Sequence, residues 1–83
     1  MKKTLYFGAE WCGPCKLMKP IVENLKKEGH DIRYYDSDKE TVLVRYYSVT
    51  SLPTFVLVDD DLEIGRWTGA TTENALRSFV KGE

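Results

Sequence analysis

The first 36 residues alternate between two kinds of hydrophobic pattern, and this alternation constrains the fold more than any other feature of the sequence. Residues Thr4 to Phe7 are rich in aromatic and β-branched side chains and end at Gly8, which favours a buried strand. Apolar residues then recur at helical spacing from Leu17 to Leu25, and Asp31 to Asp36 reads as a second strand. Because a crossover of this kind within one sheet is parallel and right-handed, the pattern predicts an α/β fold.

The rest of the chain predicts a short helix, a hairpin and a last helix. Ser37 to Glu40 has capping-box spacing before a short apolar stretch. Thr54 to Val58 and Glu63 to Thr68 flank three consecutive aspartates, which is typical of an antiparallel hairpin. Thr71 or Thr72 can cap the last helix. The predicted order is βαβαββα, a three-layer α/β/α sandwich with a mixed four-stranded sheet.

The length and charge of the chain limit its organisation and partners. With 83 residues, we expect a single domain that spans residues 1–83. We also expect a monomer. Twelve basic and thirteen acidic residues alternate along the sequence, so no basic surface for nucleic acid is expected. The longest apolar run, Phe55 to Val58, is far shorter than the roughly 20 residues that cross a bilayer, so no membrane segment is expected.

The N-terminal residues do not match a secretion signal. After Lys2 and Lys3, the apolar stretch runs only from Leu5 to Ala9 before Glu10 interrupts it, whereas a signal needs about 7–15 apolar residues. The expected location is therefore cytoplasmic. Thiols stay reduced there, so a closely spaced pair of cysteines is more often catalytic or metal-binding than structural.

The candidate site is Trp11-Cys12-Gly13-Pro14-Cys15, between the first strand and the first helix. Two thiols three positions apart at a helix start can approach closely enough to form a disulfide. Cys12 is expected to be exposed at the positive end of the helix dipole, where free N–H groups favour a thiolate. Cys15 lies one turn deeper on the apolar side, and we expect it to be buried and neutral. This asymmetry predicts thiol–disulfide exchange, in which Cys12 is the nucleophile and Cys15 resolves the mixed disulfide.

The sequence resembles the thioredoxin family, as a short member. The resemblance rests on Ala9 to Lys16, Pro20, Leu52-Pro53-Thr54 and Gly69, and it runs from roughly Tyr6 to Val80. The first strand and helix that are usual in the family are absent, which leaves a size nearer to that of glutaredoxins. The resemblance implies that Leu52–Pro53 is a cis-proline bond. The substrate-binding surface that it implies consists of Trp11, Gly13, Pro14, Leu52, Pro53 and Gly69.

The resemblance also implies a function, that of a protein-disulfide reductase with Cys12 and Cys15 as its catalytic residues. No bound cofactor or metal is expected, because electrons come from NADPH through thioredoxin reductase. The partners are then thioredoxin reductase and disulfide-containing proteins. One alternative is a glutaredoxin-like redoxin reduced by glutathione or by thioredoxin reductase, although Gly13-Pro14 and the lone Gly69 favour thioredoxin. Another is a non-catalytic module that binds a partner through the same surface.

The sequence departs from the family at one informative position. Most thioredoxins carry a buried aspartate six positions before the first cysteine, where it helps to deprotonate the second thiol. Tyr6 stands there in this chain and, by our alignment, Tyr34 replaces a lysine on the neighbouring strand. Since a tyrosine of pKa about 10 is not a base at neutral pH, Cys15 must lose its proton to water, to Glu10 or to the departing thiolate. We expect resolution of the mixed disulfide to be slower, or to depend differently on pH, than in typical relatives.

Other residue patterns support weaker hypotheses. A structural zinc site needs four ligands, and only the distant His30 could supply a third. His30 is also too far from Cys12 to be the base of a cysteine hydrolase. Asp59-Asp60-Asp61 lacks the spaced ligands and glycine of a calcium loop, so a turn is expected. Tyr34-Tyr35 and Tyr46-Tyr47 lack a basic groove and indicate core packing rather than base stacking.

Overall fold

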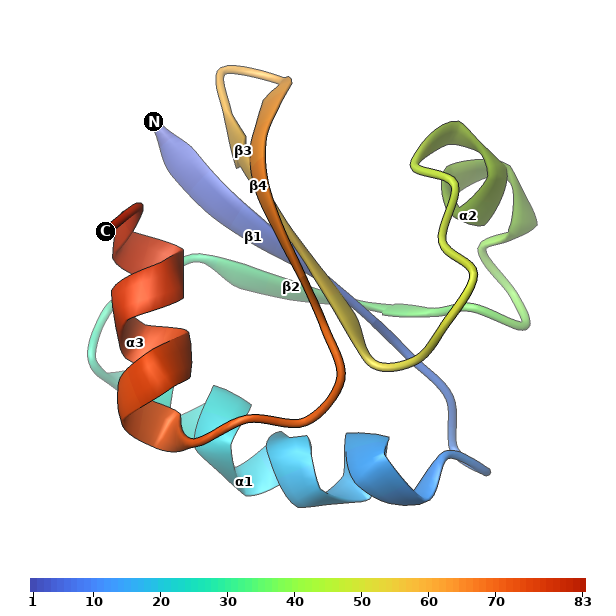
Figure 1. Cartoon of the computed structure of the whole chain (residues 1–83), viewed down its shortest axis with the longest axis horizontal. Coiled ribbons are helices and arrows are strands. Elements are labelled where there is room, and N and C mark those ends of the chain that lie inside the picture. Colours follow the sequence, from blue (N-terminus) through green and yellow to red (C-terminus); the bar gives the residue numbers. More distant parts are fainter.

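The computed structural model describes all 83 residues, which form four strands and three helices in the order βαβαββα (Figure 1). The strands are β1 (Lys2–Gly8), β2 (Ile32–Asp36), β3 (Thr54–Asp59) and β4 (Leu62–Thr68). The helices are α1 (Gly13–Lys27), α2 (Thr41–Tyr46) and α3 (Glu73–Lys81). The predicted order of elements is confirmed.

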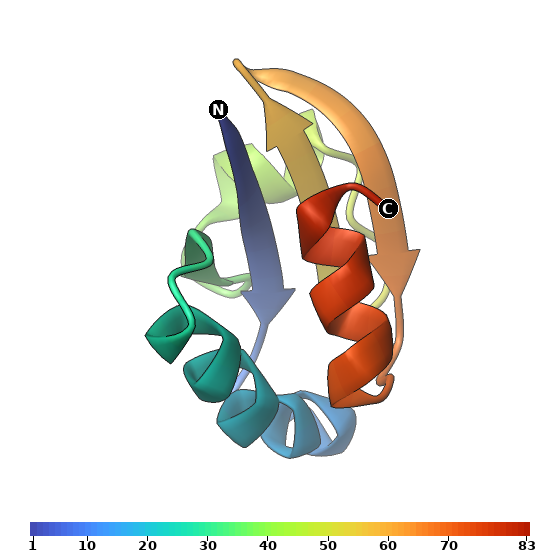
Figure 2. The ribbon, with the colours of Figure 1, turned by 90° about the vertical axis from the view of Figure 1, so that its left-hand side faces the viewer.

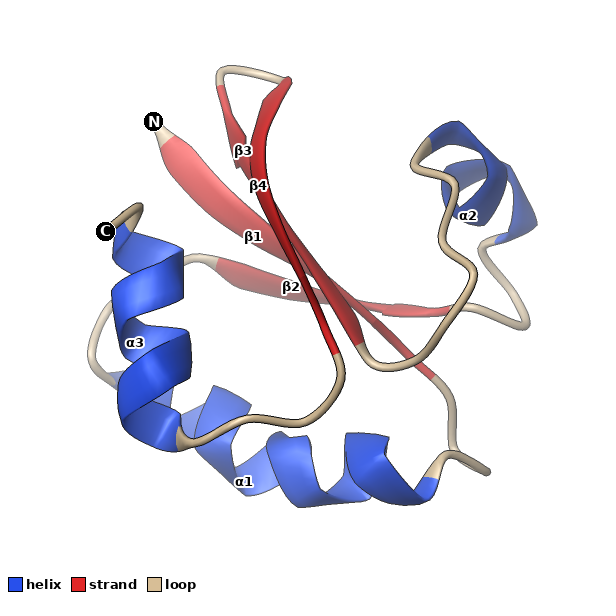
Figure 3. Cartoon of the chain, in the orientation of Figure 1, coloured by secondary structure: helices blue, strands red, loops and turns tan.

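The four strands form one mixed sheet in the order β2-β1-β3-β4 (Figure 3). β1 runs parallel to β2, and α1 connects these two strands, as the strand-helix-strand pattern predicts. β3 pairs antiparallel with both β1 and β4. β1 therefore lies inside the sheet, and its C-terminal end leads directly into the loop that carries the cysteines.

Helices cover both faces of the sheet, which confirms the three-layer prediction. α1 and α3 pack on one face and α2 lies on the other (Figures 1 and 2). The larger core lies under α1 and α3 and includes Tyr6, Met18, Val22, Leu25, Ile32, Phe55, Leu76 and Val80. The smaller core lies under α2 and consists of Leu5, Phe7, Val56 and Val58. Alternate residues of β1 belong to different cores because successive strand side chains point to opposite faces.

The helix ends agree with the sequence in α3 but not in α2. The Thr72 hydroxyl accepts a hydrogen bond from the backbone N–H of Ala75 at 3.2 Å, and Gly82 ends α3 with a φ of 81°. The prediction of a capping box from Ser37 to Glu40 is wrong. Glu40 is itself the N-cap residue of α2, and its side chain makes no capping hydrogen bond. The N–H of Ser37 instead donates to the carbonyl of Gly8, which holds this segment against the end of β1. None of the three helices combines the length and apolar character needed to span a membrane.

Several apolar residues lie on the surface, contrary to expectation. Leu17 is exposed because the buried stripe of α1 runs through Met18 and its helical neighbours, one position away. Tyr34 and Tyr46 are exposed as well, so the prediction of core packing is wrong for these two tyrosines. The same prediction is confirmed for their neighbours Tyr35 and Tyr47, which are partly buried and pack against the smaller core.

The hairpin between β3 and β4 is confirmed. Asp60 and Asp61 form its two-residue turn with φ values of 50° and 70°. Such positive φ angles give the backbone a twist that matches the twist of the flanking strands, and aspartate tolerates them better than most residues do. Two of the three consecutive aspartates thus form the turn, and Asp59 ends β3.

Candidate redox site

The cysteine motif lies where β1 ends and α1 begins. Cys12 and Cys15 form a disulfide, with their Cα atoms 5.2 Å apart. Cys12 is the N-cap residue of α1, and its sulfur accepts a hydrogen bond from the backbone N–H of Cys15 at 3.3 Å. Pro14 stands in the first turn, where a missing N–H costs no helical hydrogen bond. The local sequence therefore places the Cys12 sulfur on an otherwise unpaired donor at the positive end of a helix.

Both cysteines are buried, which corrects the expectation that Cys12 is exposed. The exposed fraction is 5% for Cys12 and 4% for Cys15. The two residues cluster with the buried Ala9, and Leu52 packs against them. In a disulfide each sulfur also covers part of the other. Exposure therefore does not distinguish the two cysteines in this oxidised form, whereas the hydrogen bond to the Cys12 sulfur does.

A cavity of about 400 Å³ borders Cys12, and its walls are mostly apolar. Trp11 and Leu52 line it together with Val44 and Val49, which belong to α2 and the loop after it. The Trp11 side chain is 68% exposed, and its Nε1 donates to the Asp38 carboxylate at 2.8 Å. The structure thus brings two of the expected contact residues, Trp11 and Leu52, to one groove beside Cys12.

The remaining expected contact residues do not line this groove. Gly13 and Pro14 are exposed at the start of α1. The Leu52–Pro53 peptide bond is cis, and Pro53 is buried. The Pro53 carbonyl accepts a hydrogen bond from the N–H of Gly69 at 2.8 Å, which ties the end of β4 to the start of β3. Gly69 has a φ of 101°, a conformation that residues with a Cβ rarely adopt.

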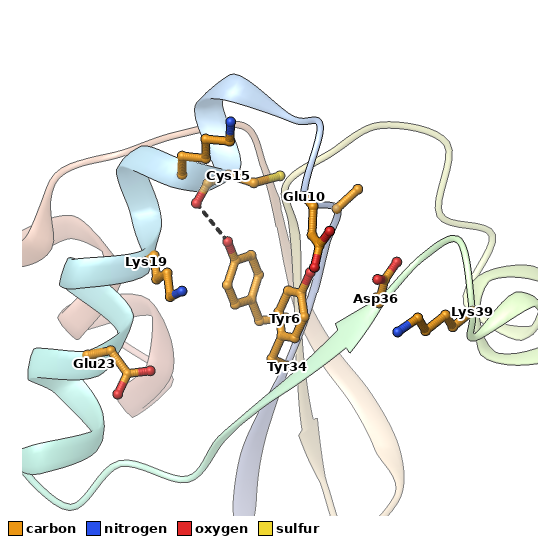
Figure 4. A pocket seen from close by; sticks show the side chains of 10 residues that line it. Tyr6, Glu10, Cys15, Lys19, Glu23, Tyr34, Asp36 and Lys39 are labelled. Carbon is orange, nitrogen blue, oxygen red and sulfur yellow. Dashed lines mark hydrogen bonds between the residues drawn. The ribbon is translucent and has the colours of Figure 1, made fainter.

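A second cavity, of about 500 Å³, borders Cys15 and differs in character (Figure 4). The buried Tyr6 forms part of its wall, and its hydroxyl donates to the backbone carbonyl of Cys15 at 3.0 Å. The Tyr6 ring stacks on Phe55 with centroids 4.8 Å apart and meets the edge of Tyr34 at 5.2 Å. Burial, followed by the proximity of Tyr34, raises the pKa of Tyr6 to about 12. Tyr6 is thus protonated at neutral pH and cannot accept the Cys15 proton.

Charged side chains complete the walls of this second cavity. Burial raises the pKa of Tyr34, and the negative charges of Asp36, Glu10 and Asp38 raise it further. Tyr34 is therefore also an acid rather than a base at neutral pH. The charged residues that line the cavity are Glu10, Lys16, Lys19, Glu23, Asp36 and Lys39.

Sequence reasoning missed the role of Gly8. A Cβ atom at this position would lie 3.1 Å from the Tyr34 ring and 3.4 Å from the Cys15 sulfur. The absence of a side chain thus leaves space between Cys15 and the two tyrosines. The only signal in the sequence is a glycine directly after an aromatic strand, and this pattern predicts no more than the end of the strand. The bond from Trp11 to Asp38 carried no sequence signal.

His30 does not approach the cysteines. It follows α1 at the end opposite the disulfide, and its Nε2 lies 3.7 Å from the Glu28 carboxylate. No group of three or more histidine, cysteine, aspartate and glutamate side chains in the structure is arranged to hold a metal ion.

These features define a class of α/β protein in which a Cys-x-x-Cys disulfide begins the helix that follows an interior strand of a mixed sheet. A comparison with protein families assigns the chain more narrowly, because the thioredoxin family model matches residues 2–82. The chain belongs to the thioredoxin family.

Individual relatives agree with this assignment. The chain is 38% identical over 80 residues to thioredoxin H2-1 of Oryza sativa, covering 87% of this chain and 58% of the relative. It is 39% identical over 82 residues to the mitochondrial thioredoxin-3 of Saccharomyces cerevisiae, covering 96% of this chain and 64% of that protein. The chain thus spans roughly three fifths of the length of these relatives.

Solved structures confirm the fold. Thioredoxin from Fasciola hepatica superposes with a TM-score of 0.89 at 37% identity, covering 98% of this chain and 79% of that one. A thioredoxin mutant from Halobacterium salinarum superposes with a TM-score of 0.91 at 30% identity, covering 98% and 73% of the two chains. The three-layer thioredoxin-like architecture expected from the sequence is therefore correct.

Proposed function

We propose that the protein is a thiol–disulfide oxidoreductase that reduces protein disulfides through Cys12 and Cys15. The observation that carries the proposal is the hydrogen bond from the Cys15 N–H to the Cys12 sulfur at the N-terminus of α1. In the reduced protein the same donor and the helix dipole favour a thiolate at Cys12. No comparable donor reaches the Cys15 sulfur, so its thiolate lacks this stabilisation.

The exchange cycle follows from this difference. The Cys12 thiolate attacks one sulfur of a substrate disulfide, and the other substrate sulfur leaves as a thiolate. Cys15 then attacks the Cys12 sulfur of the mixed disulfide, releases the second substrate sulfur and leaves the Cys12–Cys15 disulfide. Two electrons pass to the substrate. The 5.2 Å separation of the two Cα atoms lets the disulfide close without movement of the helix body.

The proposed substrate surface is the groove beside Cys12. Trp11 and Leu52 line the groove and offer apolar contact, and Gly13 and Pro14 are exposed next to Cys12 at the start of α1. Pro53, which follows Leu52, and Gly69, whose N–H donates to the Pro53 carbonyl, complete the proposed surface. A shallow apolar groove suits an extended protein segment better than a small polar molecule. Disulfide-containing proteins are therefore the proposed substrates.

The remaining parts of the proposal concern the context of the reaction. Residues 1–83 act as a single monomeric domain that binds no cofactor, and NADPH supplies electrons through thioredoxin reductase. Membership of the thioredoxin family supports this donor. The proposed compartment is the cytoplasm, where reducing conditions return the disulfide to the dithiol.

The test supplies a protein disulfide such as insulin with either NADPH and thioredoxin reductase or glutathione and its reductase. Sustained reduction with the first pair supports the proposal, and reduction with glutathione alone supports a glutaredoxin-like protein instead. The matched control replaces both Cys12 and Cys15 by serine. If this variant keeps the biological effect of the protein, the surface is a binding module and the proposed activity is wrong.

A further inference from the structure

Resolution of the mixed disulfide requires that Cys15 lose a proton, and the structure limits where this proton can go. Cys15 borders the second cavity. The residues that line this cavity belong to β1, α1, β2 and the loops that follow β1 and β2. Tyr6 and Tyr34 lie on β1 and β2 and stay protonated at neutral pH for the reasons given above. The lysine side chains of this cavity offer hydrogen-bond donors and no acceptor. Among the side chains of the cavity, the three carboxylates Glu10, Glu23 and Asp36 remain as proton acceptors.

Two of these carboxylates are poorly placed. Glu23 lies eight residues after Cys15 on α1, which corresponds to about 12 Å along the helix axis. Asp36 ends β2, and its Oδ1 accepts a hydrogen bond from the N–H of Asp38 at 2.9 Å, which directs it to the following turn. Neither is suited to receive a proton from the Cys15 sulfur.

Glu10 differs from both. It directly follows Ala9, which clusters with the two cysteines. The Glu10 side chain extends toward Tyr34 within the cavity that Cys15 borders (Figure 4), and its charge contributes to the electrostatic environment of Tyr34. No hydrogen bond or ion pair in the structure engages the Glu10 carboxylate, so it is free to bind a proton. Space next to Cys15 exists because Gly8 has no side chain.

We infer that Glu10 receives the Cys15 proton, directly or through one water molecule, when Cys15 resolves the mixed disulfide. The inference rests on the proposed exchange function. The Cys15 S–H bond breaks, its proton passes to the Glu10 carboxylate, and the Cys15 sulfur bonds to the sulfur of Cys12. The bond between Cys12 and the substrate sulfur breaks, and that sulfur leaves with the electron pair as a thiolate. Glu10 then releases its proton to solvent.

The reaction with an aromatic disulfide, dithiobis(nitrobenzoate), separates the two steps. Attack by Cys12 releases a first equivalent of coloured thiolate, and resolution by Cys15 releases a second, so stopped-flow absorbance follows both. Glu10→Gln should slow the second phase at about pH 6 by at least roughly tenfold and leave the first phase within about twofold. Glu10→Asp should restore most of the second-phase rate, which a merely structural effect of the substitution would not explain.

The pH profile supplies a second readout. With Glu10 present, the second-phase rate should change little between about pH 6 and pH 8, because the proton then passes to a side chain and not to hydroxide. In Glu10→Gln, hydroxide must remove the proton, so the rate should rise by about tenfold per pH unit and approach the wild-type rate at high pH. If the second-phase rates of the wild-type protein and of Glu10→Gln depend on pH in the same way, the inference is overturned.

Glu23→Gln is the matched control, because it makes the same chemical change in the same cavity and should leave both phases within about twofold. The inference is wrong if Glu10→Gln leaves the second phase unchanged, or if Glu23→Gln or Asp36→Asn slows it equally. If the wild-type protein releases only one equivalent, Cys15 does not resolve, and both the proposed function and the role of Glu10 are overturned. If it releases two and Glu10→Gln changes nothing, only the role of Glu10 is overturned.

Discussion

The two sides of the disulfide differ, although both cysteines are almost equally buried. The groove beside Cys12 is mostly apolar and includes the exposed indole of Trp11. The cavity beside Cys15 is formed by two tyrosines and six charged residues. Two cysteines of almost equal burial can therefore be given different chemistry by their neighbours alone. One side is suited to hold a substrate and the other to handle a proton.

Hydrogen bonds reinforce this difference. On the first side a backbone N–H donates to the Cys12 sulfur itself, which stabilises negative charge there. On the second side the Tyr6 hydroxyl donates to the carbonyl of Cys15 and not to its sulfur. The Tyr6 bond therefore positions the first turn of α1 without favouring a thiolate at Cys15.

The largest expected effect comes from removing one sulfur at a time. Cys15→Ser should form a stable mixed disulfide between Cys12 and a protein substrate, because the resolving thiol is gone. Cys12→Ser should form none, and turnover should fall at least about a thousandfold in both variants. Non-reducing electrophoresis with mass spectrometry identifies the adduct. An adduct on the remaining cysteine of Cys12→Ser would contradict the assigned roles.

The second effect compares the two thiols in one reduced molecule. Iodoacetamide near neutral pH should label Cys12 at least about tenfold faster than Cys15, because alkylation requires the thiolate. Peptide mass spectrometry after a quench measures both rates in the same sample. Equal rates, or faster labelling of Cys15, would show that the surroundings do not divide the roles in this way.

Local features of the site could be predicted from the sequence, but contacts between distant segments could not. The cysteine motif, the helix that starts at it and the N-cap position of Cys12 depend on about five consecutive residues, so the pattern was sufficient. The burial of Cys12 depends partly on Leu52, forty positions along the chain. The bonds from Tyr6 to Cys15 and from Trp11 to Asp38 likewise join separate elements. No local pattern specifies such contacts.

The fold shows the same limit. The order of elements could be predicted from hydrophobic periodicity, because a helix or strand that buries one face must carry apolar residues at the spacing of that face. The start of α2 did not follow, since Ser37 is held by the carbonyl of Gly8 and not by a capping box. Tyr34 is exposed because β2 lies at the edge of the sheet. The periodicity of apolar residues within a strand does not predict the order of the strands in the sheet.

A smaller effect is expected on the Cys12 side of the disulfide. Trp11→Ala removes apolar contact area from the groove, so the KM for a protein disulfide should rise by about three- to tenfold, with a smaller change in kcat. Tyr46→Ala is the control, because Tyr46 is an exposed aromatic residue of α2 that does not line the groove. Steady-state reduction of insulin measures both variants. A KM that rises equally in the control would mean that the groove does not bind substrate.

The smallest effect tests the Cys15 side through stability. Tyr6→Phe keeps the ring that stacks on Phe55 but removes the hydroxyl that donates to the Cys15 carbonyl. At about pH 7 the free energy of unfolding should fall by about 1 kcal/mol, since a buried acceptor loses its donor. Urea denaturation of the oxidised protein measures it, with Tyr46→Phe as the matched control because its hydroxyl makes no hydrogen bond in the structure.

The same variant should behave differently at high pH. The pKa of Tyr6 is about 12 in the folded protein and 10.0 for the unperturbed side chain, so the folded state holds the phenol proton longer than the unfolded state does. The wild-type protein must therefore lose stability as the pH rises through about 10 to 12, by up to roughly 3 kcal/mol from this group. Tyr6→Phe lacks that loss, so the stability gap at neutral pH should shrink and then reverse above about pH 11. A gap that stays constant with pH would mean that burial does not raise the pKa of Tyr6 in the folded protein.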